Sequence, residues 1–282
     1  MSICPICGSE TYPFLIHMDL FRNEVELLKC KNCGHGSYAN VWSDSQFNSI
    51  YGVDYSGDYL IPTETHLQRR AQYVLDLDIL KEFISGEIKV LDYGCSSGEY
   101  LDAMPKSWIK SGYEVNKELI PILTSTRPKY RVYSELDRIE ESFDLVVMRG
   151  VIEHIPDHAR LNEFLDKHLK VGGLMYISAT PDFSSPCAVQ YKSKWGQIVA
   201  PEHIHQFTPA SLAILLSASG LVMKALYHPY LGTPYENWES DSKLYLDNDG
   251  QQNPNEFILK NFDPFRHPFA GNMMSVIFQK IR

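Results

Sequence analysis

The chain has 282 residues, of which 44% are hydrophobic, enough for one sizeable α/β domain and a small module. Its 26 Lys and Arg against 35 Asp and Glu leave a net charge of −9, and no basic run of five or more occurs, so nucleic acid is not the expected partner. The start, Met1-Ser2-Ile3-Cys4, lacks the basic flank and apolar core of a signal peptide, and no stretch of about 18 apolar residues occurs, so we expect a cytoplasmic protein without membrane insertion.

Two Cys-x-x-Cys-Gly motifs stand in the amino-terminal part of the chain, separated by roughly twenty positions. This spacing is that of a four-thiolate zinc ribbon, and four soft thiolates in a closed tetrahedral array suit a structural Zn²⁺ ion. A disulfide framework is the alternative, but nothing indicates an oxidising compartment. His17 or His35 could in principle replace one thiolate. We predict a zinc ribbon at residues 1–40 with four ligands, Cys4, Cys7, Cys30 and Cys33.

The segment 41–62 is rich in aromatic residues and glycine. We interpret it as a connector that packs the ribbon onto the main domain, with a flap over the cofactor or acceptor as the alternative. From 63 to 84 apolar residues recur with helical periodicity, which predicts an amphipathic helix. Its polar face is expected to be solvated, although His66, Arg69 or Arg70 could reach a cofactor carboxylate. The predicted apolar face holds Leu67, Ala71, Val74, Leu75, Leu77, Leu80, Phe83 and Ile84.

The most informative stretch reads Lys-Val-Leu-Asp-Tyr-Gly-Cys-Ser-Ser-Gly-Glu-Tyr-Leu at 89–101 and is followed by Gly-Tyr-Glu-Val at 112–115. A short apolar run ends in Asp92, and Gly94 and Gly98 then bracket a tight turn before a helical pattern. Glycine lets the backbone bend sharply and approach a ligand, and the following helix offers its free N–H groups. Glu114 is placed to accept hydrogen bonds from both ribose hydroxyls. The pattern predicts a nucleoside-binding βαβ unit.

The glycine spacing separates two classes of cofactor. A nicotinamide or flavin fingerprint needs G-x-G-x-x-G, with the pyrophosphate on the helix end. Here the pattern is Asp-x-Gly-x-x-x-Gly, and an acid ahead of the turn suits a ligand that carries a positive charge. This resembles the first motif of class I S-adenosylmethionine-dependent methyltransferases, whose cofactor is a sulfonium with an amino-acid tail. Ser96 departs from that motif, since many members carry a further glycine there.

The resemblance continues downstream and covers roughly residues 65–230. The run Phe-Asp-Leu-Val-Val-Met-Arg-Gly-Val-Ile-Glu-His-Ile-Pro-Asp at 143–157 resembles the family's fourth-strand motif. Leu-Lys-Val-Gly-Gly-Leu-Met-Tyr-Ile-Ser at 169–178 resembles the fifth-strand motif, in which a Gly-Gly turn ends a helix and starts a buried strand. The implied fold is α/β, a Rossmann-like seven-stranded sheet, mostly parallel with an antiparallel last strand, preceded by the zinc ribbon.

The chain from 63 to 282 is assigned to this methyltransferase domain. Thr208 is the expected N-cap of a helix near 209–219, with Pro209 at its first position and Gly220 after its end. An insertion at about 231–271 shows no clear periodicity; it could cover the acceptor pocket or be disordered. Strands are expected near 88–92, 110–115, 130–133, 143–148, 174–178, 221–227 and 273–280, with helices between most of them.

The family resemblance implies S-adenosyl-L-methionine as the cofactor and places its parts along the motifs. The methionine portion is expected at the glycine loop, the ribose on Glu114, and the transferring methyl group just past the fourth strand. Met148 could equally pack in the core. The expected cofactor-binding residues, ending with a loosely matching adenine pair, are Asp92, Gly94, Cys95, Gly98, Glu114, Met148, Arg149, Glu135 and Leu136.

Methyl transfer from a sulfonium requires alignment and removal of the acceptor's proton, so a base is the residue to find. Histidine titrates near neutrality and can take a proton from a hydroxyl or from a carbon next to a carbonyl. His154 follows the fourth strand, and His203 and His205 stand in a Glu-His-x-His cluster before a helix. Ribbon, methyltransferase core and Glu-His pair together resemble the nucleotide-sugar C-methyltransferases of deoxysugar pathways. That resemblance implies Glu202 and His203 as the acid/base pair.

Enzymes of that group continue into a further carboxy-terminal domain that helps to bind the sugar nucleotide, whereas this sequence stops at Arg282. The Pro-Glu-His pattern also occurs in O-methylating enzymes. We therefore predict methyl transfer to a small-molecule acceptor such as a sugar, a nucleotide sugar or a glycan precursor, with the methylated atom left open. The alternatives are a methyltransferase that acts on RNA or protein, and a catalytically idle S-adenosylmethionine-binding scaffold whose ribbon mediates partner binding.

Overall fold

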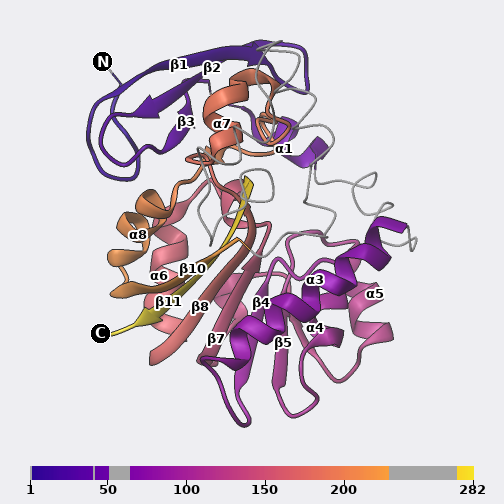
Figure 1. The fold of residues 1–282 in the computed structure, drawn as a ribbon. Coiled ribbons are helices and arrows are strands. Elements are labelled where there is room, and N and C mark those ends of the chain that lie inside the picture. The colour runs from indigo at the N-terminus through magenta and orange to yellow at the C-terminus, as the bar shows by residue number, and fades with distance from the viewer. Residues whose placement is uncertain (1, 41, 51–63, 229–271) are drawn as a thin grey trace.

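A seven-stranded sheet forms the centre of the larger part of the molecule (Figure 1). The structure is a computed structural model and describes residues 2–40, 42–50, 64–228 and 272–282. The strand order is β10–β11–β8–β7–β4–β5–β6, in which β11 runs antiparallel to both neighbours and the pairs from β8 to β6 are parallel. This confirms the predicted sheet. Its strands are β4 (Lys89–Tyr93), β5 (Ile109–Tyr113), β6 (Arg131–Tyr133), β7 (Phe143–Arg149), β8 (Leu169–Pro181), β10 (Leu221–Tyr227) and β11 (Met273–Lys280).

The Gly-Gly pair lies within β8. This differs from the sequence-based prediction, which places the pair between a helix and a strand. Leu169 already pairs with Phe143, and the register then jumps so that Leu174 pairs with Leu145. Gly172 has a φ of 82°, which glycine adopts without strain. The two glycines therefore form an irregularity inside a longer strand, and β8 begins five residues earlier than the expected 174.

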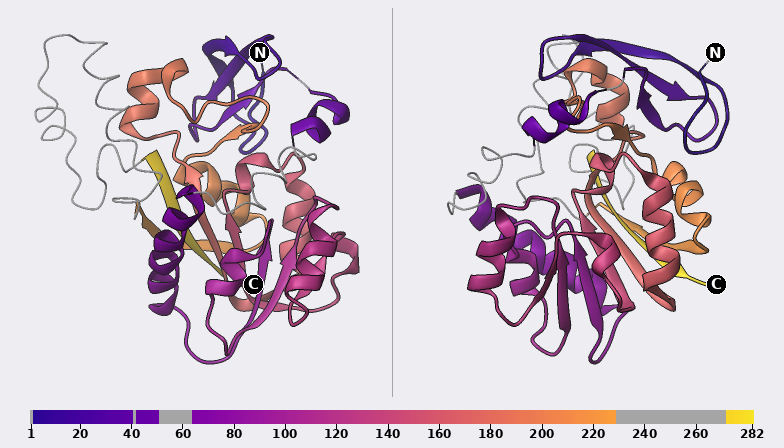
Figure 2. Two further views of the ribbon diagram at one scale, coloured as in Figure 1. Left: turned by 90° about the vertical axis from the view of Figure 1, so that its right-hand side faces the viewer. Right: turned by 180° about the vertical axis from the view of Figure 1, so that it is seen from behind.

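Helices cover both faces of the sheet (Figures 1 and 2). On one face, the apolar side chains of α3 (Glu64–Lys81), α4 (Glu99–Ala103) and α5 (Leu119–Thr126) pack with residues of β4, β7 and β8. On the other face, α6 (His158–His168) and α8 (Pro209–Ser217) pack with the opposite sides of the strands. The predicted punctuation of α8 is confirmed, since Thr208 caps its start in a capping box and Gly220 follows its end at a φ of 66°. Three short 3₁₀ helices complete this part: η1 (Leu136–Arg138), η2 (Ile152–His154) and η3 (Lys192–Lys194).

The face that α3 turns toward the sheet differs from the one predicted by periodicity. Val74 and Leu75 are 56% and 37% exposed, whereas Gln72 and Asp76 are fully buried. Burying a carboxylate and an amide costs free energy unless they are hydrogen-bonded. Asp76 has such partners in the neighbouring strands, so the helix presents a partly polar face to the interior; the partners are described with the site below.

A second, four-stranded antiparallel sheet contains the amino-terminal residues. It has the order β1–β2–β3–β9, with β1 (Thr11–Met18), β2 (Glu24–Cys30) and β3 (Gly36–Tyr38) followed by β9 (His205–Gln206), which comes much later in the chain. We call residues 2–40 the amino-terminal module. Its Leu27 packs with Phe183 and with residues of α7 (Pro186–Tyr191), and its Val25 packs with Trp42 just before α1 (Asp44–Ile50). Figure 1 shows this module at one end of the molecule, beyond the edge of the larger sheet.

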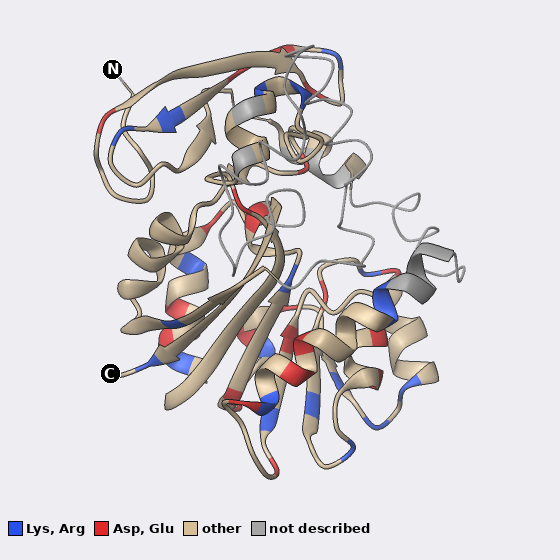
Figure 3. Cartoon of the chain, viewed as in Figure 1, with Lys and Arg blue, Asp and Glu red and all other residues tan. Residues whose placement is uncertain are grey.

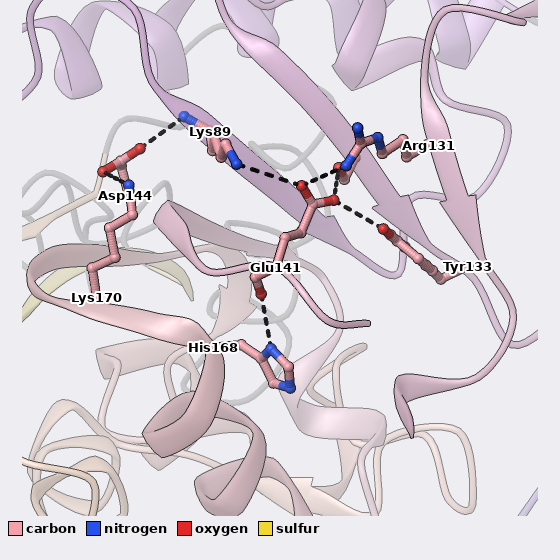
Figure 4. A network of polar contacts seen from close by, with 8 residues as sticks. Lys89, Arg131, Tyr133, Glu141, Asp144, His168 and Lys170 are labelled. Carbon is pink, nitrogen blue, oxygen red and sulfur yellow. Dashed lines mark hydrogen bonds and ion pairs between the residues drawn. The ribbon is translucent and has the colours of Figure 1, made fainter. Parts of the chain in front are cut away.

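Polar contacts tie together the amino ends of the parallel strands (Figure 4). The Glu141 carboxylate accepts hydrogen bonds from Arg131 Nη1 at 3.0 Å and from the Tyr133 hydroxyl at 2.9 Å. The Glu141 carbonyl accepts a hydrogen bond from Nδ1 of His168 at 2.8 Å. Asp144 accepts one hydrogen bond from the backbone N–H of Lys89 and another from the ammonium group of Lys170. The charged side chains named here are therefore paired with one another and with the backbone at this edge of the sheet.

Two predicted segments lie outside or mostly outside the described residues. The insertion at 231–271 falls within 229–271, and of the connector only 42–50 is described. In the described ranges, no helix is long and apolar enough to cross a membrane. Lys and Arg are interspersed with Asp and Glu over the elements drawn in Figure 3.

Candidate active site

A cavity of about 480 Å³ lies at the carboxyl ends of β4, β5 and β7. In a parallel sheet the loops that follow the strands meet at this edge, where ligands of α/β proteins bind. Six of the predicted cofactor-binding residues line it: Asp92, Gly94, Cys95, Glu114, Leu136 and Arg149. Of the predicted catalytic residues, His154 lines it.

The glycine loop after β4 is built for a close approach of backbone to ligand. Gly94 and Gly98 have φ angles of 83° and 81°, in the left-handed region that favours glycine. A Cβ on Gly94 would lie 2.6 Å from a methyl group of Val151, so the loops after β4 and β7 can meet only if residue 94 has no side chain. Gly98 does not line the cavity; a Cβ there would clash with Leu123 of α5 at 2.8 Å. Gly98 thus shapes the turn from behind the cavity.

Asp92 is buried at the floor of the cavity, close to the Arg149 guanidinium. Burial raises the pKa of Asp92 to about 7, although the charge of Arg149 opposes this shift. Arg149 is held from α3, since its Nη2 donates to Gln72 Oε1 at 2.7 Å and its Nε lies 3.3 Å from Asp76 Oδ2. The Asp76 carboxylate also accepts a hydrogen bond from the Tyr176 hydroxyl at 2.7 Å. One acid and one fixed guanidinium therefore stand together at the end of the cavity where the amino-acid tail of the cofactor is expected.

Glu114 follows β5, and its carboxylate is buried. One carboxylate oxygen accepts the backbone N–H of Asn116 and the other accepts that of Ser96, both at 2.8 Å. These bonds fix the carboxylate between the β5 loop and the glycine loop. Burial raises its pKa, while the two N–H groups oppose the shift. Each carboxylate oxygen retains a further lone pair, so the group can still accept hydrogen bonds from two ligand hydroxyls.

Besides Gly98, two predicted cofactor residues do not line the cavity. Met148 is fully buried in the core between the sheet and α6, as the packing alternative anticipated. Glu135 does not line the cavity and forms an ion pair with Arg138 at 3.5 Å, whereas its neighbour Leu136 does line it. At the expected adenine site the structure therefore presents the aliphatic residue and leaves the acidic one in solvent.

His154 and His203 are brought together although they lie far apart in the sequence. Their ring centroids are 4.9 Å apart. Nδ1 of His154 lies 2.7 Å from the carbonyl oxygen of Glu202, and Nδ1 of His203 lies 2.8 Å from that of Gln197. A carbonyl oxygen only accepts, so each Nδ1 carries the proton and each Nε2 carries a lone pair. Burial lowers the pKa of His154 to about 3 and also lowers the pKa of His203, so both rings are neutral near pH 7.

Glu153 lies behind this pair and is completely enclosed. Its Oε1 is 3.9 Å from Nε2 of His154, and its Oε2 accepts a hydrogen bond from the Thr180 hydroxyl at 3.1 Å. Burial raises the pKa of Glu153 to about 8. The carboxylate and the two imidazoles offer atoms within 4.8 Å of one another, so the group could hold either a proton or a metal cation.

His203 does not line the cavity itself, and neither do the other two predicted catalytic groups. Glu202 contributes its backbone carbonyl to the orientation of His154, and its side chain is not part of the cavity lining. His205 contacts a different set of rings: its Nδ1 lies 3.2 Å from Nε2 of His35, and its ring centroid is 4.2 Å from that of His158. His205 thus belongs to the contact between the amino-terminal module and α6.

The four cysteines of the amino-terminal module converge. Sγ of Cys4 lies 3.7 Å from that of Cys33, and Sγ of Cys7 lies 3.4 Å from that of Cys30. All four sulfurs lie within 4.8 Å of one another, and the six cysteines of the chain form no disulfide. A tetrahedron of sulfurs about 2.3 Å from a zinc ion has edges of about 3.8 Å, so the donor set fits this ion. His17 and His35 are not in the group.

Several residues of the cavity were not predicted from the sequence. Arg69, for which a solvated position was favoured over contact with a cofactor carboxylate, lines the cavity, and so does Tyr73 one turn further along α3, which was not predicted. Ser96 carries a buried hydroxyl without a hydrogen-bond partner in the described part of the chain, as expected where a ligand's polar group would fit. The acid-then-aliphatic order of Glu114 and Val115 could have indicated that Val115 follows into the cavity. An acid for an ammonium group, a carboxylate for ribose hydroxyls and this unpaired hydroxyl together suit the expected cofactor.

Comparison with known proteins supports the methyltransferase class that the sequence motifs resemble. A family model described as a methyltransferase domain matches residues 64–226. The ubiquinone biosynthesis O-methyltransferase of Hydrogenovibrio crunogenus is 27% identical over 146 residues, which cover 48% of this chain and 58% of that protein. The mitochondrial ubiquinone biosynthesis O-methyltransferase of Homo sapiens is 27% identical over 182 residues, which cover 56% of this chain and 48% of that protein. The chain therefore spans about half the length of these two relatives.

Among solved structures, the 1,6-didemethyltoxoflavin-N1-methyltransferase of Burkholderia thailandensis is similar in fold, with a TM-score of 0.51 and 13% sequence identity. The match covers 95% of this chain and 100% of that one. That structure contains bound 1,6-didemethyltoxoflavin and S-adenosylhomocysteine.

Proposed function

The chain belongs to the class I S-adenosylmethionine-dependent methyltransferases, and from this we propose that it methylates a small-molecule acceptor, with a sugar, a nucleotide sugar or a glycan precursor as the substrate class. The observation that carries the proposal is the convergence of Asp92, Glu114 and His154 on one cavity. Asp92 suits the ammonium group of the cofactor, Glu114 suits its ribose hydroxyls, and His154 is a neutral imidazole in the lining of the same cavity.

The cofactor would lie along the carboxyl ends of β4, β5 and β7. Asp92 would attract the ammonium group of the methionine tail, and Glu114 would accept hydrogen bonds from the ribose hydroxyls. Arg149 and Arg69 would balance the carboxylate of the tail, since both line the same cavity. Leu136 would pack against the adenine ring. When bound, the cofactor supplies a methyl group on a positively charged sulfur, which is already a good leaving group.

The protein's part in the transfer would be to align the acceptor and to take its proton. His154 lines the cavity, and the carbonyl of Glu202 holds its ring in the tautomer whose basic nitrogen is Nε2. As the acceptor's oxygen or carbon forms its bond to the methyl group, its proton would pass to this nitrogen. His203 stands close enough to take the proton onward from the resulting imidazolium, and Glu153 would stabilise that cation when it is ionised, above about pH 8. This shares the role between His154 and His203 and leaves the Glu202 carboxylate outside the proton path.

The acceptor class rests on the resemblance to nucleotide-sugar C-methyltransferases and on the histidine pair. A sugar hydroxyl, or a sugar carbon next to a carbonyl, needs a base because neither ionises near neutral pH. A second candidate is a phenolic acceptor, which is favoured by the ubiquinone biosynthesis O-methyltransferases among the relatives. A phenol ionises more readily, so its methylation would depend less on the histidines.

For the amino-terminal module we propose a structural zinc ion bound by Cys4, Cys7, Cys30 and Cys33. Four protein thiolates would close the coordination sphere, so the ion would have no position for water and no part in the reaction. The sulfur-to-sulfur distances of 3.4 Å and 3.7 Å support this assignment.

The test is calorimetric titration of protein of known zinc content with S-adenosylmethionine and, separately, with NAD. Micromolar binding of the first and none of the second is the expected result. The loaded protein is then incubated with methyl-labelled cofactor and three acceptor sets: nucleotide sugars, polyhydroxylated phenols, and RNA. Label in the first set supports the proposal, and label only in the second supports the phenolic alternative. Cofactor binding without transfer to any set would favour an idle scaffold, and absence of cofactor binding would refute the proposal.

A further inference from the structure

β9 connects the candidate active site with the amino-terminal module. It consists of His205 and Gln206 and starts two residues after His203. Within the described residues it pairs with β3 alone, through Gly36 with Gln206 and Ser37 with His205. In its strand pairing this part of the chain is therefore joined to the module and not to the seven-stranded sheet.

Further contacts hold both sides of this segment against the module. On the amino-terminal side, the backbone N–H of Leu20 donates to the carbonyl of Ala200 at 2.8 Å. On the carboxy-terminal side, the Thr208 hydroxyl donates to the carbonyl of Cys33 at 2.7 Å and is buried. The contact with β3 is close, since a Cβ on Gly36 would lie 2.8 Å from Cβ of Gln206. Residues 197–206, which we call the histidine loop, and Thr208 just after them are therefore held at several points by residues 20–37.

The histidine loop in turn orients the two imidazoles. The carbonyls of Gln197 and Glu202 fix the Nδ1 protons of His203 and His154. The loop closes on itself because the backbone N–H of His203 donates to the carbonyl of Val199 at 2.7 Å. A shift of the loop by an ångström would break bonds of this length and release both rings.

We propose that the amino-terminal module positions His154 and His203 by holding the histidine loop, so that Gly36 and Thr208 act as positioning residues for the acceptor side of the active site. The inference deepens the proposed function and rests on it for the role of the two histidines. It also gives the module a task in the reaction, since the loop that it holds sets which nitrogen of each ring is free of a proton.

The cofactor side of the cavity does not depend on these contacts. Asp92 lies in β4, Gly94 follows β4 and Glu114 follows β5, and both strands belong to the parallel part of the seven-stranded sheet. Glu114 is held by the backbone N–H groups of Ser96 and Asn116, which belong to the loops after these same two strands. A disturbed module should therefore leave cofactor binding intact while the histidines lose their fixed tautomer. This separation is what the experiment exploits.

The test substitutes Gly36→Ala in the full chain and follows two readouts that need no acceptor. Calorimetry measures the Kd of S-adenosylhomocysteine, and ¹⁵N-detected imidazole spectra at pH 7.5 report the tautomers of His154 and His203, assigned with His154→Gln and His203→Gln. The matched control is Gly196→Ala, because a Cβ on Gly196, which adjoins the loop, has no atom within 4 Å. We expect the Kd of S-adenosylhomocysteine for Gly36→Ala to stay within about twofold of the parent value, because Gly36 contacts none of the residues expected to hold the cofactor. The Nδ1–H signals should average or move to the other tautomer in Gly36→Ala only.

A second pair of variants keeps the inference testable if Gly36→Ala does not fold. Thr208→Val removes the hydroxyl that reaches the Cys33 carbonyl, whereas Thr208→Ser keeps it, so the tautomer signals should change in the first and recover in the second. Unchanged histidine signals in both Gly36→Ala and Thr208→Val would overturn the inference. A parallel loss of cofactor binding would overturn it as well, because the module would then support folding in general. A parent protein that binds no S-adenosylhomocysteine would instead count against the proposed function.

Discussion

Replacement of Glu114 by alanine tests the ribose assignment most directly. The carboxylate is buried, and each of its oxygens already accepts one backbone N–H at 2.8 Å. If it also accepts hydrogen bonds from the ribose hydroxyls, Glu114→Ala removes a charge-assisted pair worth about 1–3 kcal/mol. At 1.4 kcal/mol per tenfold, the Kd of S-adenosylmethionine should rise by about 5- to 150-fold. Glu114→Gln keeps one carbonyl oxygen as an acceptor and should fall between the two proteins.

Calorimetric titration of the three proteins measures this series, with circular dichroism as a check on folding. The matched control is Glu140→Ala, which removes the same charge from an exposed position next to the seven-stranded sheet. Its Kd should equal that of the parent. An unchanged Kd in Glu114→Ala would remove the ribose assignment. An equal loss in Glu140→Ala would show that net charge, and not the hydrogen bonds, governs cofactor affinity.

Three further outcomes follow from the site. Burial raises the pKa of Asp92 from 3.8 to about 7, and the carboxylate is the form that attracts an ammonium group, so cofactor affinity should fall by about tenfold per unit as the pH drops below about 7. Titrations at several pH values measure this, and Asp92→Asn should bind weakly at every pH; an equally steep profile in that variant contradicts the assignment. His203→Gln should keep the parent's Kd for the cofactor but lower turnover of an identified acceptor by about a hundredfold or more, and full turnover would exclude a role in proton transfer. Elemental analysis should find one zinc per chain and none in Cys33→Ser; a second equivalent of metal would indicate that the histidine pair binds a cation and is not a base.

Local sequence patterns were sufficient to predict the central sheet and the loops at its carboxyl edge. Asp92, Gly94 and Glu114 lie within one βαβ unit, so the direction of the chain alone brings them to one edge. The four cysteines were predictable for a similar reason, since two Cys-x-x-Cys turns on one short hairpin module have few ways to be arranged. In each case the informative residues are close in sequence or repeat a known spacing.

Predictions failed or stopped short where a partner lies far along the chain. The periodicity of α3 suggested an apolar face, but Asp76 is turned inward because its partners Arg149 and Tyr176 come 73 and 100 residues later. The three candidate histidines could not be ranked, because the closeness of His154 to His203 depends on how the loop after α7 is anchored. That anchor is β9, a two-residue strand that is too short for any pattern to reveal.

The pairing of β3 with β9 has a consequence for how the chain is made. The contact between His35 and His205 joins residues 170 positions apart, so residues 2–40 cannot complete their sheet until the ribosome has added about that many further residues. At typical synthesis rates this delay is about 10–30 s. During that time Leu27 and Val25 lack their partners Phe183 and Ala200, and their apolar surface is open to unwanted association. Expression fragments cut between the module and the larger sheet should aggregate for the same reason, whichever half is kept.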